Sequence, residues 1–285
     1  MRIKIITDST ADLPINLVGD LGITVVPVYV RFGNEVFRDG VDITQEEVYR
    51  RLLAGEVPPA TSQPPPADFA AYYREALKNY DEVISIHLSS KLSGTFNSAL
   101  SGRDLLPEKA RITVLDSLSL SMGLGLAAVT AARLCLAGAS KEAIVESVKQ
   151  TAPLTRIIAM FDTLKYAFRS GRLGAAKSLI GGILNVKPLL TLRDGSFWPV
   201  GIARTRVRAF DTMVDLVRKT PDIADVAVVY ATTPDEAETL KERLSAFVEK
   251  TRIHISRLGP ALGAHGGPGI MAVFIRQQPA ALPLA

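Results

Sequence analysis

The chain is poor in the features that crosslink a protein or anchor it in a membrane. Cys135 is the one cysteine among 285 residues, so no disulfide can form within the chain, which fits a reducing compartment. Its place in a helical pattern predicts a buried structural thiol. The uncharged run 117–132, rich in Ser and Gly, is shorter than the roughly 18 residues of a membrane-spanning helix. The opening residues lack the apolar centre of a signal peptide, so we expect a cytoplasmic protein.

Several signatures of catalysis and cofactor binding are missing as well. The sequence has no Walker A loop, no Gly-x-Ser-x-Gly elbow, and no cluster of residues at metal-ligand spacing. The segment GLGLAA at 123–128 superficially matches a dinucleotide fingerprint, but the preceding strand pattern ends near Asp116, too early for a tight strand–turn–helix unit. The net charge is +4, yet its lysines and arginines are scattered. We expect no metal, no cofactor and no nucleic-acid partner.

The order of the predicted elements indicates two domains. Hydrophobic residues make up 47% and charged residues 22%, as in an ordinary soluble globular protein. Short apolar strands at 3–6, 81–88 and 111–117 alternate with helical patterns, which predicts an α/β N-terminal domain with a mostly parallel sheet. After Pro153, a hairpin signal at Asp194-Gly195 and interspersed helices predict an α+β C-terminal domain. We place the domains at 1–152 and 153–285.

Local patterns also predict where some elements begin. Asp12 stands at the N-cap position of a helix that has Pro14 in its first turn. Thr44 and Glu47 have the spacing of a capping box. The extended stretch ITVVPVYVRF is disturbed by Pro27.

The stretch SSKLSGTFNSA at 89–99 concentrates hydroxyl groups where a strand pattern gives way to a helix pattern. Ser93 is well placed as the N-cap of that helix. A helix start offers free amides and a positive dipole end, so an anion could rest on the Ser93 hydroxyl and the amides of Gly94 and Thr95. Alternatively, Ser93 caps the helix and binds nothing. The residues alone favour this second interpretation, because serine is so common at N-caps.

Two more segments present polar groups on a constrained backbone. Thr61 and Ser62 precede a proline run, TSQPPP, which predicts a stiff loop that leads into a helix. His265 lies in the glycine-rich segment GPALGAHGGPG, where it could donate to an anion, act as a base or bond its own loop. His87 and His254 lie inside strand patterns and are expected to be structural.

The segment FRSGRL contributes Arg169 and Arg172 on either side of a glycine. Such a pair could neutralise a carboxylate or a phosphate, or form a docking surface. A solvated helix end is the alternative.

Taken in order, these residues resemble the DegV family of bacterial lipid-binding proteins. The resemblance covers nearly the whole chain, and its motifs are specific jointly rather than singly. The matching segments are TDSTADLP (7–14), TSQP (61–64), SSKLSGTFNSA (89–99), LDS (115–117), LKYAFRSGRL (164–173), ILNVKPLL (183–190) and GPALGAHGGPG (259–269).

The resemblance implies a non-catalytic protein that buries a long-chain fatty acid, of palmitate or oleate type, between an α/β and an α+β domain. Family members of this kind serve as the fatty-acid-binding subunit of a fatty acid kinase. They present the carboxylate to a separate ATP-binding subunit, which makes an acyl phosphate for phospholipid synthesis. Transient contact with a membrane surface is part of the same expectation.

Residue by residue, the resemblance assigns the carboxylate to the hydroxyls of Thr61 and Ser93, the backbone of Gly94 and the ring of His265. Arg169 and Arg172 match a basic stretch of the family and would neutralise charge or dock a partner, with Arg169 named as a ligand of the carboxylate and Arg172 as a supporting or docking residue. Ser62 and Thr95 are supporting candidates.

The chain departs from the family pattern at three places. Pro65 and Pro66 follow TSQP where serine is usual, Ser170 replaces a glycine between the arginines, and Ala264 and Gly266 replace threonines beside the histidine. These departures affect which hydrogen bonds the carboxylate receives and which acyl chain the protein prefers.

Two rival functions remain from the residues. One is a hydrolase or acyltransferase that uses Ser93 and His265, for which Asp8 is the candidate orienting carboxylate. The other is a binder of a phosphorylated metabolite that uses the same helix start and the arginines.

Overall fold

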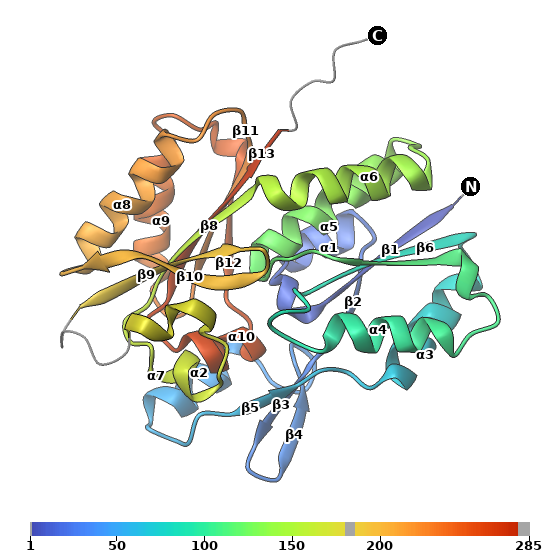
Figure 1. Ribbon diagram of the computed structural model, residues 1–285, viewed down its shortest axis with the longest axis horizontal. Coiled ribbons are helices and arrows are strands. Elements are labelled where there is room, and N and C mark those ends of the chain that lie inside the picture. Colours follow the sequence, from blue (N-terminus) through green and yellow to red (C-terminus); the bar gives the residue numbers. More distant parts are fainter. Residues whose placement is uncertain (1, 180–185, 279–285) are drawn as a thin grey trace.

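Parallel strands organise the first half of the chain, as the sequence predicts. The computed structural model describes residues 2–179 and 186–278, and its first sheet has the order β2-β1-β6-β7 with every pairing parallel (Figure 1). The strands are β1 (Ile3–Asp8), β2 (Thr24–Val26), β6 (Glu82–His87) and β7 (Ile112–Asp116). Their side chains are largely buried because helices cover both faces, which is usual for a parallel sheet.

A small antiparallel sheet of order β4-β3-β5 lies beside the first one. Its strands are β3 (Tyr29–Phe32), β4 (Glu35–Arg38) and β5 (Ala60–Ser62). The sequence predicts one extended stretch here, but Pro27 separates β2 from β3, which belong to different sheets. The TSQPPP segment, predicted to be a loop, begins with β5, because Thr61 pairs with Val30.

The second half of the chain builds a mixed six-stranded sheet of order β10-β9-β8-β13-β11-β12. The strands are β8 (Thr155–Met160), β9 (Lys187–Arg193), β10 (Ser196–Ala203), β11 (Ile223–Tyr230), β12 (Ile253–Arg257) and β13 (Met271–Gln277). The predicted hairpin is confirmed: Asp194 and Gly195 join β9 to β10 with φ of 49° and 76°. Two positive φ values at the turn match the twist of the paired strands.

Ten helices are found in the described ranges, and they surround the sheets in layers. Their bounds are α1 (Ile15–Asp20), α2 (Gln45–Leu53), α3 (Pro66–Leu77), α4 (Thr95–Asp104), α5 (Ser121–Leu136), α6 (Lys141–Thr151), α7 (Lys165–Arg169), α8 (Arg206–Arg218), α9 (Pro234–Leu244) and α10 (Pro260–Gly266). Figure 1 shows α3 and α4 on one side of the first sheet, and α8 and α9 outside the second. The fold class expected from the sequence is confirmed.

Helix α5 joins the two halves of the molecule. It is almost completely buried and contacts β1 and β6 of the first sheet as well as β11 and β13 of the second. Gly125 allows the helix to lie against the loop after β1, because a Cβ there would lie 2.7 Å from the carbonyl oxygen of Ala11. The GLGLAA segment is thus the interior of a packed helix. Cys135, near its end, is half-buried rather than buried, and its thiol donates to the carbonyl of Ile3.

The predicted helix starts have mixed outcomes. Thr44 does cap α2, because its hydroxyl accepts the amide of Glu47. Asp12 does not cap α1, whose N-cap position is held by Pro14 without a side-chain hydrogen bond. Asp12 instead has φ of 50° and turns its carboxylate away from α1.

Among the described residues, no helix is both long and apolar enough to cross a bilayer. Residues 183–185 of the ILNVKPLL segment lie outside the described residues.

The close packing of α3 on α4 can be tested at Gly102. A Cβ at this position would lie 2.6 Å from the Cβ of Phe69 and from the carbonyl oxygen of Pro66, so α3 would have to move. We expect Gly102→Ala to lower the free energy of unfolding by about 1–3 kcal/mol, measured by urea denaturation.

Gly19→Ala is the matched control, since a Cβ in that helix has no neighbour within 4 Å. It should be neutral or stabilising, by up to about 1 kcal/mol, through helix propensity. Equal stability of the two variants would contradict the packing argument.

Candidate functional site

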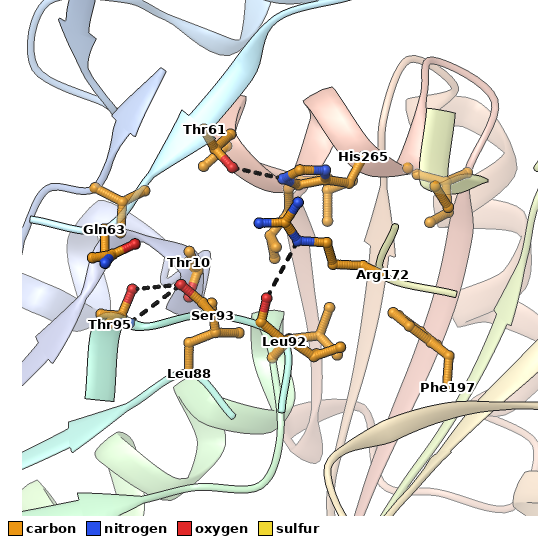
Figure 2. Close-up of a pocket in the computed structure, with 18 of the residues that line it drawn as sticks. Thr10, Thr61, Gln63, Leu88, Leu92, Ser93, Thr95, Arg172, Phe197 and His265 are labelled. Atoms are coloured by element: carbon orange, nitrogen blue, oxygen red, sulfur yellow. Dashed lines mark hydrogen bonds between the residues drawn. The ribbon is translucent and has the colours of Figure 1, made fainter. Parts of the chain in front are cut away.

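A largely apolar cavity lies between the two halves of the chain (Figure 2). The space between its lining atoms amounts to about 800 Å³, with the open solvent at its mouth included. Both halves supply its apolar lining, which includes Val28, Leu88, Leu120, Phe161, Phe197 and Ile270. Its main polar lining groups are Thr61, Ser62, Ser93, Thr95, Arg172 and His265. Such a cavity suits a ligand with a long apolar body and a compact polar head.

The topology explains why polar groups gather on one side of this cavity. Thr10 follows the carboxyl end of β1, and Ser93 and Thr95 follow the carboxyl end of β6, its neighbour in the sheet. Loops at the carboxyl ends of parallel strands share one edge, where open α/β sheets bind their ligands. Figure 2 shows Thr61, Gln63, Ser93 and Thr95 on one side and Phe197 on the other. The head group of a ligand would therefore lie at the edge of the sheet.

The structure brings Thr61 and His265 into direct contact. The hydroxyl of Thr61 lies 2.7 Å from Nε2 of His265, although 204 residues separate them. Thr61 is presented by β5, and His265 by the last turn of α10, which replaces the glycine-rich loop expected from the sequence. Burial, with a smaller contribution from the Arg172 cation, lowers the pKa of His265 to about 4. The imidazole is therefore neutral near pH 7.

The neutral ring has one proton, and its surroundings indicate which nitrogen carries it. Nδ1 of His265 is buried and has no hydrogen-bond partner among the described residues. A buried N–H without an acceptor is rarer in proteins than an unused acceptor. The proton is thus assigned to Nε2, which donates to the Thr61 hydroxyl. The Thr61 proton is then free to donate into the cavity.

Ser93 and its neighbours form a second polar group on the same side of the cavity. The Ser93 hydroxyl lies 2.9 Å from that of Thr95 and accepts the Thr95 amide at 3.3 Å. The predicted N-cap role is corrected, because Gly94 occupies the N-cap position of α4. Gly94 does not line the cavity, but a Cβ there would lie 2.8 Å from Nε2 of Gln63. Glycine thus allows the Gln63 side chain to lie against the start of α4.

The two arginines of FRSGRL occupy different places. Arg172 lines the cavity, and its Nε lies 3.5 Å from the carbonyl of Leu92. Figure 2 shows its guanidinium directed toward His265. Arg169, named from the sequence as the stronger ligand candidate, ends α7 with an exposed side chain and is absent from the cavity lining. The structure therefore places Arg172, and not Arg169, beside the candidate head-group position.

Two buried carboxylates hold the helix that presents His265. Asp12 accepts the amide of Gly259 at 2.9 Å and the hydroxyl of Ser121 at 2.5 Å. Asp39 accepts the hydroxyl of Ser9 at 2.8 Å and also the Ala261 amide. Burial raises the pKa of Asp12 well above its usual value and that of Asp39 to about 7. Sequence reasoning missed both roles, and the polar run after β1 was a signal for Asp12 alone.

Ser93, His265 and Asp8 are not arranged as the catalytic triad of a serine hydrolase. The hydrogen bonds of Ser93 go to Thr95 and not to His265. Asp8, the proposed orienting carboxylate, accepts Nδ1 of His87 at 2.9 Å instead. His87 is fully buried and also contacts the hydroxyl of Ser85, which confirms its structural role.

Comparison with known proteins agrees with this architecture. The sequence profile of a family described as "Uncharacterised protein, DegV family" matches residues 2–278. The chain belongs to the DegV family. It is 39% identical to a DegV domain-containing protein of Caldanaerobacter subterraneus subsp. tengcongensis. The alignment spans 280 residues and covers 97% of this chain and 99% of that relative.

Solved DegV structures have the same fold. A DegV family protein from Thermus thermophilus, described with fatty acid binding, superposes with a TM-score of 0.91 at 34% identity, covering 98% of this chain and 100% of that one. DegV from Bacillus subtilis, described as a fatty acid binding protein, has a TM-score of 0.86 at 32% identity, with coverage of 98% and 100%.

The assigned proton position can be tested by NMR of the ligand-free protein. We expect His265 to be neutral at pH 6 with its proton on Nε2, as read from the ¹⁵N shifts of the ring. In Thr61→Val the ring loses its hydroxyl partner, so this preference should disappear. A proton on Nδ1 in the wild type would contradict the assignment.

Asp39 should make stability depend on pH. Its pKa rises from 3.8 to about 7 on folding, so its contribution is fully present below about pH 4 and is lost as the pH rises through about 7. Between pH 5 and 8 we expect the wild type to lose about 2–3 kcal/mol more unfolding free energy than Asp39→Asn, by urea denaturation.

Asp20→Asn, a change at an exposed carboxylate, is the control for that experiment. It should keep the pH dependence of the wild type. A parallel pH profile for Asp39→Asn and the wild type would show that Asp39 does not titrate in this range.

Proposed function

We propose that this DegV protein binds a long-chain fatty acid in the cavity and presents its carboxylate to a separate ATP-binding kinase subunit. The observation that carries the proposal is the apolar cavity with hydroxyls, a neutral histidine and one arginine on one side. The Thermus thermophilus and Bacillus subtilis relatives, both described with fatty acid binding, support the same ligand class.

The apolar and polar parts of the lining contribute differently to ligand binding: the first contacts the acyl chain and the second the carboxylate. Each buried CH₂ of the ligand contributes about 0.8 kcal/mol before ordering costs, so the apolar lining supplies most of the affinity. A carboxylate taken out of water needs several donors, because an unsatisfied group costs about 1–3 kcal/mol or more. Thr61 and Ser93 offer hydroxyls, and Arg172 offers a charge-assisted donor. His265 then acts on the ligand through Thr61, since its one proton is already donated.

The kinase part of the proposal rests on the resemblance to family members that serve a fatty acid kinase. In such a system ATP is held by the other subunit, and this chain has no Walker A loop. In the transfer, a carboxylate oxygen attacks the terminal phosphorus of ATP, the bond to ADP breaks and ADP leaves. The exposed Arg169 is free to face that subunit. This protein would itself be non-catalytic and need no cofactor.

Two organisational features belong to the same proposal. The strands of the first two sheets end by Asp116 and those of the third begin at Thr155, which supports domains at 1–152 and 153–285. Transient contact with a membrane surface is included because a free long-chain acid partitions into lipid.

Mass spectrometry of the purified protein tests the ligand directly. We expect a stoichiometric fatty acid, of palmitate or oleate type, in the native spectrum and its release on denaturation. The folded double variant Thr61→Ala, Ser93→Ala should lose most of it, because two of the carboxylate donors are gone. Titration with palmitate should show a fall in affinity of roughly tenfold or more.

The matched control removes two hydroxyls on the outer helices of the second sheet, in Thr212→Ala, Ser245→Ala. It should retain the lipid. A protein that is empty and also takes up neither palmitate nor oleate would refute fatty acid binding.

A further inference from the structure

A second and more open pocket adjoins the cavity. It encloses about 550 Å³ including open solvent, and shares Leu92 and Arg172 with the cavity. Lys91, Ser170, Gly171 and Ser196 also line it. We call it the basic pocket. Because Arg172 belongs to both linings, a ligand head group in the cavity lies next to this pocket.

The charge of the basic pocket is positive. Among the described residues, Lys91 and Arg172 are its two charged lining residues, both with exposed side chains, and no carboxylate lines it. Neither cation forms an ion pair within residues 2–179 and 186–278, although many other arginines there do. Arg172 uses Nε on Leu92 and Nη1 on the carbonyl of Ser170, and Nη2 has no partner in the same ranges. Five fixed donors on the guanidinium suit the oxygens of a phosphate.

Three separate chain segments build this pocket and are held together. The turn after β6 supplies Lys91, the turn after α7 supplies Ser170 and Arg172, and the start of β10 supplies Ser196. The hydroxyl of Ser89 donates to the carbonyl of Gly195 at 2.9 Å, which ties the β9–β10 hairpin to the turn with Lys91.

The fit between hairpin and turn depends on glycine. A Cβ at Gly195 would lie 2.3 Å from the Ser89 hydroxyl and 3.4 Å from Cγ of Lys91. The stem of Lys91 is therefore held against the hairpin beside Ser196. The backbone segments of the pocket are therefore fixed by the fold, and Lys91 and Arg172 extend from them as exposed side chains.

We propose that the basic pocket is a phosphoryl subsite, which binds a phosphate dianion at the head of a ligand whose chain fills the cavity. The inference rests on the proposed function, since it needs the acyl chain in the cavity. A carboxylate carries one negative charge, which the neutral donors and Arg172 satisfy. A phosphate monoester carries close to two charges and more acceptor oxygens, so it requires a second cation, and Lys91 is the one available.

Two sources could supply that phosphoryl group. It could be joined to the acyl chain, with phosphorus beyond the carboxyl oxygen, or it could be free phosphate beside a bound fatty acid. Hexadecyl phosphate is a stable probe for the first source, because its ester oxygen and phosphorus follow a chain of the length of palmitate. Inorganic phosphate is the probe for the second.

The test is calorimetric titration of the full chain with palmitate and with hexadecyl phosphate, in the wild type and in Lys91→Met. We expect the variant to lose roughly tenfold in affinity for hexadecyl phosphate, because one charge-assisted contact is gone. Its affinity for palmitate should stay within about twofold, because Lys91 does not line the cavity. Lys109→Met removes the same charge before the amino end of β7 and should change neither affinity.

Repeating the titrations with millimolar inorganic phosphate distinguishes the two sources of the phosphoryl group. Weaker binding of hexadecyl phosphate, with unchanged palmitate binding, supports a subsite that also takes free phosphate. Absence of competition, with the Lys91→Met loss still present, supports a phosphoryl group carried on the chain.

Three results separate failure of the subsite from failure of the proposed function. Equal affinities of Lys91→Met and wild type for hexadecyl phosphate, or an equal loss for both ligands, would overturn the phosphoryl subsite. A wild type that binds palmitate but not hexadecyl phosphate would also overturn it, and would leave fatty acid binding intact. A wild type that binds neither ligand would refute the proposed function itself.

Discussion

The site depends on one hydrogen bond, from the amide of Gly259 to the buried carboxylate of Asp12. Asp12 belongs to the loop after the first strand, and Gly259 begins the helix that presents His265, so this bond joins the two halves at the cavity wall. No side chain larger than glycine fits here, because a Cβ at 259 would lie 2.7 Å from the carboxylate. Asp39 reinforces the contact through Ala261. The position of His265 is therefore set by the first sheet as well as by its own helix.

Burial of these groups gives the polar side of the cavity its electrostatic character. The ring of His265 is kept neutral because protonating it would bury a charge beside Arg172. The donors that face the cavity are then hydroxyls aligned by fixed partners, Thr61 by the ring and Ser93 by the start of α4. Among the described lining residues, Arg172 is the one permanent cation. A single anionic head group satisfies this set, and the proposed phosphoryl subsite adds Lys91 as a second cation beside it.

The two halves meet at places where glycine permits close approach. Gly263 brings α10 against Tyr49 of α2, and Gly195 brings the β9–β10 hairpin against the turn that holds Lys91. The cavity is lined about equally by both halves. A substitution at either glycine would act on the cavity by moving one half relative to the other, without touching the ligand. Architecture and site are thus coupled through backbone contacts more than through the lining itself.

Short-range patterns of apolar, glycine and hydroxyl residues were enough to predict the parallel strands of the first half, the Asp194-Gly195 hairpin and the Thr44 cap. Motif resemblance also singled out Thr61, Ser93 and His265, which all line the cavity. The tertiary structure alone decided which residues meet. Asp12 has the local pattern of a helix cap but bonds Gly259, 247 residues away, because a distant partner outcompetes a neighbouring one only once the halves pack. Arg172 rather than Arg169 reaches the cavity for the same reason, since the turn that ends α7, and not residue spacing, sets the direction of each side chain.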